Sequence, residues 1–172
     1  CSVLDALLFD SPKDVQEFVK NADADVQKVV YEGYFLFAMM WVIGGCNVAN
    51  CASAFNDVWY STDGIDWTRS TSNAQWEGRE RHTSLVFDGK LWTIGGEAGT
   101  GSTEQNDVWY STDGKDWTQA TLAAQWKVLS DHTSLVYDSK MWIIGGDSDA
   151  TPQAEIWYST DGVDWTQSTA AA

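Results

Sequence analysis

The sequence predicts an all-β protein built from three repeated antiparallel units that follow a short helix. The Gly-Gly pairs at 44–45, 95–96 and 145–146 are 51 and 50 residues apart. A segment at 56–71 (NDVWYSTDGIDWTRST) returns almost unchanged at 106–121 and in shorter form at 155–169. All 11 tryptophans fall into four columns of this period. Such a period indicates units that bury their apolar faces against their neighbours.

Residues 1–26 are predicted to form a leader outside the repeat. Pro12 stands where a first helical residue is expected, and apolar residues then follow at helical spacing, so a helix is predicted at about 12–22. The chain starts at Cys1 without an initiator Met. Processing, truncation and an incomplete sequence each explain this start, and lipidation of Cys1 is one such form of processing.

The second unit shows the predicted strands most clearly. Strands are expected at 83–88 (TSLVFD) and at 90–96 (KLWTIGG), joined by an Asp-Gly turn and ended by the two glycines. A loop at 97–105 leads to strands at 106–112 and 116–121, which a second Asp-Gly turn connects. The predicted domain at 27–172 therefore consists of four-stranded units at about 27–79, 80–129 and 130–172.

The first unit is degenerate. Its segment 29–33 (VVYEG) matches 85–89 (LVFDG), but five additional residues precede its Gly-Gly pair, and the His-Thr-Ser that opens the other two units is missing. Its apolar run at 34–43 covers ten residues. A membrane helix needs about twenty, so this run is predicted to be a buried strand or core segment.

The spacing, the four strands per unit, the Gly-Gly pairs and the downstream tryptophans resemble kelch repeats of a β-propeller. The resemblance implies propeller blades whose loops at one end bind partner proteins. Closed propellers have about four to eight blades, so three units leave three alternatives open: a longer array, two chains with three blades each, or a capping partner. The STDGxDW turns resemble the Asp box of sialidase-type propellers, although Ser61, Asp63, Gly64 and Trp67 stand one residue closer together than in that pattern.

The tryptophan columns are predicted to be structural. A buried indole removes about 150–250 Å² from water, worth roughly 4–6 kcal/mol as an upper bound. If the columns were ligand platforms, each sheet would lose its main packing groups. The serine and aspartate of each STDG turn are expected to accept hydrogen bonds from turn amides.

Function is expected at the end of the units where the loops after the second and fourth strands emerge, because the loops after the Gly-Gly pairs differ strongly in sequence. His82 and His132 are predicted to be hydrogen-bonded strand-end residues. The arginines of WEGRERH are either an anion contact or, as favoured here, solvated charges that offset Glu77 and Glu80. The candidate binding residues are Trp76, Arg79, Arg81, Glu97, Glu104, Trp126, Lys127, Asp147 and Asp149.

No cofactor or metal is expected. The acidic stretch 147–155 (DSDATPQAE) offers oxygen ligands for Ca²⁺ but lacks a full set at regular spacing. The two histidines and three arginines do not supply the ligand set of kelch-type copper oxidases or the arginine cluster of sialidases. A non-catalytic binding or scaffold role is therefore predicted, with a protein partner or self-association that completes the ring; the alternative is a glycan-binding or sialidase-like propeller module.

Charge and cysteines bear on partners and location. The formal net charge of −15 opposes contact with nucleic acid and anionic lipid. Cys46 and Cys51 are close enough in sequence for a local disulfide, and two free thiols are the alternative. Together with a lipidated Cys1, a disulfide leads us to expect a periplasmic, cell-surface or secreted protein.

Overall fold

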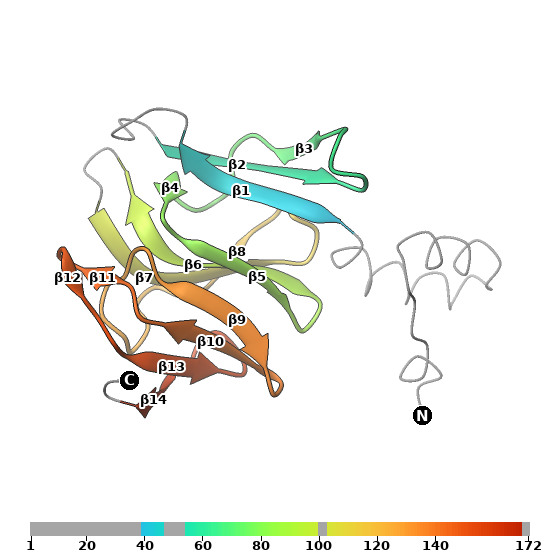
Figure 1. Ribbon diagram of the computed structural model, residues 1–172. Coiled ribbons are helices and arrows are strands. Elements are labelled where there is room, and N and C mark those ends of the chain that lie inside the picture. The colour runs from blue at the N-terminus through green and yellow to red at the C-terminus, as the bar shows by residue number, and fades with distance from the viewer. Residues whose placement is uncertain (1–38, 47–53, 100–102, 170–172) are drawn as a thin grey trace, which may run out of the picture.

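A computed structural model of the chain describes residues 39–46, 54–99 and 103–169. These residues form three large antiparallel sheets that follow one another along the chain, which confirms the all-β prediction (Figure 1). The leader with its expected helix, and the strand expected at 29–33, lie outside the described residues.

Each unit contributes one sheet. In the first, β1 (Met40–Cys46) pairs with β2 (Ala54–Ser61), and β2 pairs with β3 (Thr68–Thr71). The second contains β4 (Arg79–Glu80), β5 (Thr83–Phe87), β6 (Lys90–Ala98), β7 (Thr103–Ser111) and β8 (Thr118–Thr121). In the third, β9 (Thr133–Tyr137), β10 (Lys140–Ile144), β13 (Ile156–Ser159) and β14 (Thr166–Thr169) pair in that order. A small hairpin of β11 (Asp147–Ser148) and β12 (Thr151–Pro152) extends from the third unit.

The first two Gly-Gly pairs produce bulges, whereas β10 ends at Ile144, directly before the third pair. The sequence predicts that glycines 95 and 96 end their strand, but β6 continues through them to Ala98 and shifts register between Ile94 and Gly96. Both glycines have positive φ, at 55° and 90°. A Cβ on Gly96 would lie 2.5 Å from the Glu80 carbonyl oxygen, so a larger residue would separate β6 from the preceding linker.

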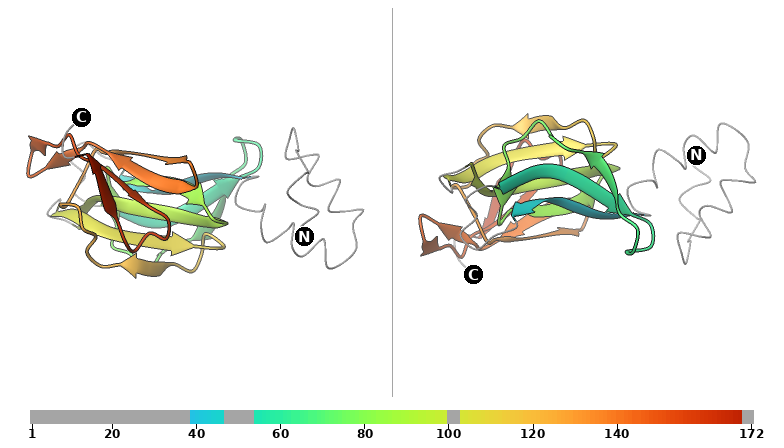
Figure 2. Two further views of the ribbon diagram at one scale, coloured as in Figure 1. Left: turned by 90° about the horizontal axis from the view of Figure 1, so that it is seen from below. Right: turned by 90° about the horizontal axis from the view of Figure 1, so that it is seen from above.

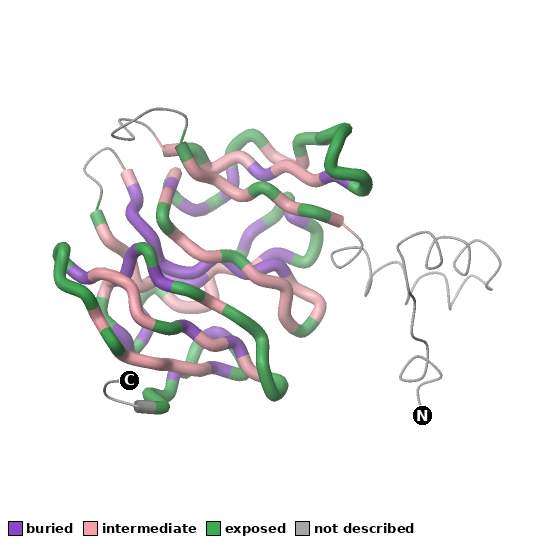
Figure 3. Tube along the Cα trace, viewed as in Figure 1, coloured by how far each residue is buried: buried purple, intermediate pink, exposed green. Residues whose placement is uncertain are grey.

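The sheets stack face to face, with the buried residues between them (Figures 2 and 3). One cluster lies between the first and second sheets, and another between the second and third. Trp76, Trp92, Trp117, Trp126 and Trp165 are buried in these clusters, so the prediction of interior indoles is confirmed for five of the 11 tryptophans. Five of the others are half-buried, and Trp67 is exposed.

The STDG turns fold alike in all three units. The Ser61 hydroxyl accepts a hydrogen bond from the Gly64 amide at 2.8 Å, and the Asp63 carboxylate accepts amides from residues 65 and 66. The same bonds recur around Ser111 and Ser159, as the sequence predicts. The amide of Ile65, followed by that of Asp66, lowers the pKa of Asp63.

The described sheets form an open stack rather than a closed ring (Figure 1). The tight turns lie at one end of this stack, here called the turn end. The described residues at the ends of β1 and β6, the segment after β10 and the linkers between units lie at the other, called the loop end. This arrangement confirms the prediction that loops and linkers share one end.

Candidate binding site at the loop end

Backbone pairing joins the linkers to the loops at this end. The linker strand β4 pairs with the end of β6, where Arg79 lies opposite Ala98. One unit later, Ser130 forms a two-way bridge with Asp147, with N–O distances of 3.0 and 2.8 Å. Each linker is thereby fixed to the next unit's loop, and the loop end has a defined backbone frame.

Glu104 ties two units together at the rim of this frame. One carboxylate oxygen accepts a hydrogen bond from the Ser130 hydroxyl at 3.2 Å, and the other accepts the Asp149 amide at 2.8 Å. The Lys127 ammonium donates to the Gln153 side chain at 3.3 Å across the same boundary. The predicted residues Glu104, Lys127 and Asp149 therefore lie near one another where the second and third units meet.

Arg81 lies at the surface between two carboxylates. Its guanidinium is 2.9 Å from Glu97 and 3.6 Å from Asp131, and these carboxylates raise its pKa. Arg81 and Asp131 occupy the same position of successive units and both have positive φ, 54° and 53°. The Asp131 amide also donates to the Arg81 carbonyl at 3.1 Å. Two adjacent left-handed residues thus hold charged side chains at the loop end, a conformation that costs of order 1–3 kcal/mol per residue.

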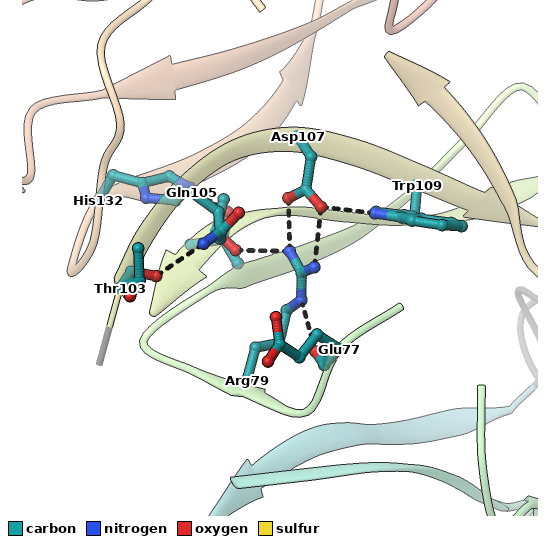
Figure 4. A network of polar contacts seen from close by, with 9 residues as sticks. Glu77, Arg79, Thr103, Gln105, Asp107, Trp109 and His132 are labelled. Atoms are coloured by element: carbon teal, nitrogen blue, oxygen red, sulfur yellow. Dashed lines mark hydrogen bonds and ion pairs between the residues drawn. The ribbon is translucent and has the colours of Figure 1, made fainter. Parts of the chain in front are cut away.

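Arg79 is buried, so the expectation of a solvated charge is wrong for this residue. Its guanidinium forms a bidentate pair with Asp107 at 2.8 and 3.0 Å and donates to the Gly95 carbonyl at 2.9 Å (Figure 4). The Trp109 indole donates to the same carboxylate at 2.7 Å. The reason is that Asp107 is itself buried and needs a cation, which the preceding linker supplies.

Trp76 and Trp126 are also buried and do not contribute to the accessible surface. Each packs edge-to-face on the turn tryptophan of the next unit, with centroids 5.8 Å apart for Trp76–Trp117 and 5.9 Å for Trp126–Trp165. Of the other predicted binding residues, Arg81, Lys127 and Asp149 are exposed, Glu104 and Asp147 are half-buried, and Glu97 is buried beside Arg81.

The two histidines are held neutral beneath this surface. Burial, followed by the Arg79 charge, lowers the pKa of His82 to about 4, and burial lowers that of His132 to about 4. The His132 Nε2 is 2.9 Å from the Thr83 hydroxyl, which links the start of β5 to the residue directly before β9. This contact confirms that His132 is a hydrogen-bonded strand-end residue.

The described residues contain no group of three or more His, Cys, Asp or Glu side chains arranged to hold a metal ion. Their exposed aromatic side chains are Phe55 and Trp67 of the first unit and Tyr137 of the third. Cys46 takes part in a disulfide, while Cys51, its expected partner, lies outside the described residues, as does Cys1.

Sequence reasoning missed two residues of this end, Asp107 and Asp131. Asp107 stands in the recurring NDVWY segment, where its charge gives no sign of burial. Asp131 was detectable, because it follows Arg81 by one repeat and its opposite charge suits a contact between neighbouring units.

The protein is therefore a repeat protein of stacked antiparallel sheets with an acidic loop end. Among solved structures, one titled "Structure of YjhT" is similar, with a TM-score of 0.62 and 14% identity. The similarity covers 77% of this chain and 49% of that one, so the chain spans about half of that structure's length. The likeness concerns the fold. No curated protein matches the chain.

The family is given by a match of residues 1–88 to the dynein heavy chain AAA lid domain. Since this match covers just over half of the 172 residues, the chain belongs to that family. Membership of the kelch-repeat family, expected from the sequence, is therefore wrong. Within the matched stretch, residues 39–46 and 54–88 form β1 to β5, and β6 to β14 lie beyond it.

In the described part of the chain, no helix has the length and apolar character needed to cross a membrane.

Proposed function

We propose that this chain is a non-catalytic binding module with propeller-like stacking, which recognises a partner protein at its loop end. The observation that supports this best is the fixed frame of that end. Linkers and loops of different sequence are joined across units by backbone bridges and by Glu104, on top of rigid sheets. Variable loops on a rigid scaffold are suited to recognition.

The charge at this end indicates the chemistry of the partner. Arg79 is neutralised in the interior, and Arg81 is already paired with Glu97 and Asp131. The carboxylates at 77, 80, 104, 147 and 149 are exposed or half-buried, and none of them forms a salt bridge with another described residue. A partner with lysine and arginine side chains would complement this surface.

A location outside the cytoplasm belongs to the same proposal. The disulfide at Cys46 supports it, because disulfides persist mainly in oxidising compartments. Mass spectrometry of the native protein, with and without reduction, tests this part: a free thiol at Cys46 in freshly isolated protein would contradict it.

Binding at the loop end is tested with a display library of random peptides. Lysine- and arginine-containing peptides should be enriched, and the pair Glu77→Lys with Asp147→Lys should weaken their binding at least tenfold. The matched control, Asp66→Lys with Asp116→Lys, makes the same charge change at the turn end, where both residues are exposed. Equal loss in both double variants would reduce the effect to net charge and overturn the assignment to the loop end.

A further inference from the structure

The two internal boundaries between units are built from the same residue positions. At each boundary, the turn glycine of the later unit lies against the indole of the earlier one: Gly114 on Trp41, and Gly162 on Trp92. A Cβ on either glycine would clash with that indole. The turn tryptophan then packs on the linker, and its amide donates to a linker glutamine: Trp117 to Gln75 and Trp165 to Gln125, at 2.6 and 2.8 Å.

In the first sheet, the positions that a later unit uses for this contact are not covered by another unit of the described region. This surface, which includes Met40, Val42, Gly64 and Trp67, is here called the leading face. Trp67 is 38% exposed, whereas Trp117 and Trp165 at the same position are each 4% exposed. Met40 and Val42 are both 47% exposed, while their counterparts in β6 and β10 are buried. Gly64 meets only the Met40 side chain and no indole.

The third sheet carries the positions that an earlier unit uses for this contact. This surface, which includes Leu135, Tyr137, Trp142 and Ile144, is here called the trailing face. Ile144 is 37% exposed, whereas Ile94 at the same position is 0% exposed. Leu135 and Tyr137, whose counterparts in β5 pack against the core, are exposed as well.

On the trailing face, Trp142 already has the surroundings of the indole that receives a turn glycine at an internal boundary. The rings of Trp142 and Tyr158 are tilted by 42° with centroids 4.9 Å apart, and Lys140 lies over both rings. The same three-residue arrangement in the second unit, where Trp92 lies 5.3 Å from its tyrosine, receives the Gly162 turn.

We propose that a second copy of this chain docks head to tail, so that the leading face of each copy covers the trailing face of the other. The Gly64 turn would lie on Trp142, and Met40 and Val42 would cover Ile144, as their counterparts do within the chain. The occupant is a further copy because the open faces repeat an interface that this sequence forms twice with itself. Two copies also match the length of the similar solved structure, of which one copy covers 49%.

The proposal is independent of the loop end, because it uses the faces of the terminal sheets.

Sedimentation equilibrium of the full chain across a dilution series is the test. We expect a species of twice 19.1 kDa that dissociates on dilution. Val42→Glu on the leading face and Ile144→Glu on the trailing face should each weaken association at least tenfold, because each places a charge in the contact. Leu122→Glu is the matched control, since Leu122 is 75% exposed on a linker. Near-ultraviolet circular dichroism shows whether the variants keep the fold, as exposed positions should.

Mixing the variants separates head-to-tail docking from symmetric docking. A mixture of Val42→Glu and Ile144→Glu retains one intact pair of faces and should form a two-chain species that neither variant forms alone. A 19.1 kDa mass at every concentration would overturn the proposal. So would a ladder of larger oligomers, which indicates faces that do not close in pairs, or association that only one of the two variants weakens.

Discussion

Replacing Arg79 by alanine should destabilise the protein strongly. The guanidinium is 1% exposed, pairs with Asp107 through two short hydrogen bonds, and satisfies the Gly95 carbonyl. Its removal leaves a buried carboxylate whose remaining side-chain partner is the Trp109 indole. Removing one member of a buried ion pair costs about 3–5 kcal/mol, so Arg79→Ala should lower the free energy of unfolding by that amount.

The double variant Arg79→Leu with Asp107→Asn is the informative comparison. Leu129 already occupies the position of Arg79 in the next repeat and is buried there, which shows that this backbone site accepts leucine. Without a buried charge, the double variant should lie within about 1–2 kcal/mol of the parent protein. Urea unfolding followed by tryptophan fluorescence measures both. A loss below about 1 kcal/mol for Arg79→Ala, or a double variant as unstable as the single one, would refute the reasoning.

Two further predictions compare equivalent positions of the repeat, and a third compares the pH dependence of stability with and without a buried histidine. Trp117→Ala should cost about 3–5 kcal/mol, whereas Trp67→Ala, at the same position but open to solvent, should cost less than half as much; thermal unfolding ranks the two. Gly162→Ala and Gly64→Ala share the cost of a positive φ, but only Gly162 has an indole in the way, so its variant should melt at a clearly lower temperature. Equal melting temperatures would argue against that contact. Because burial lowers the pKa of His132 to about 4, the unfolded chain binds more protons between pH 6.5 and 4. Stability should therefore fall as the pH drops through this window, by up to about 3 kcal/mol per buried histidine. In His132→Gln the slope of unfolding free energy against pH should be shallower, and an unchanged slope would contradict the assignment.

Much of the fold follows from the repeat itself. The recurring Asp-Gly turns and β-branched segments predict strands and hairpins, because these signals are local. The burial of Trp76, Trp92, Trp117, Trp126 and Trp165 was also predictable, because indoles that recur in successive units can pack between those units.

The parts that sequence reasoning misplaced depend on contacts between distant segments. Arg79 is buried because Asp107, 28 residues later, is carried by β7 to the same interior point. Leu129 at the equivalent position was the available signal, because an apolar residue in the same column indicates an interior site. The glycines at 95 and 96 form a bulge instead of a strand end because β7 begins as early as Thr103 and continues to pair with β6.

The family could not be predicted from the repeat pattern, because the family match covers the part of the chain where the pattern is weakest. The matched stretch of residues 1–88 includes the leader and the degenerate first unit, where the period is weakest. Periodicity therefore emphasised the second half of the chain, which that match does not cover.

The contact between a turn glycine and the indole of the preceding unit has a consequence for how such a chain can change over time. Both internal boundaries use the same contact between a turn glycine and an indole, so one unit can follow another without a change of the residues at the boundary. Duplication or loss of a whole unit of about fifty residues would leave every remaining seam intact, and the gene could lengthen or shorten in such steps. Replacement of one of these glycines by a larger residue, by contrast, would produce a clash with the indole. The glycine positions should therefore tolerate substitution far less than the loops.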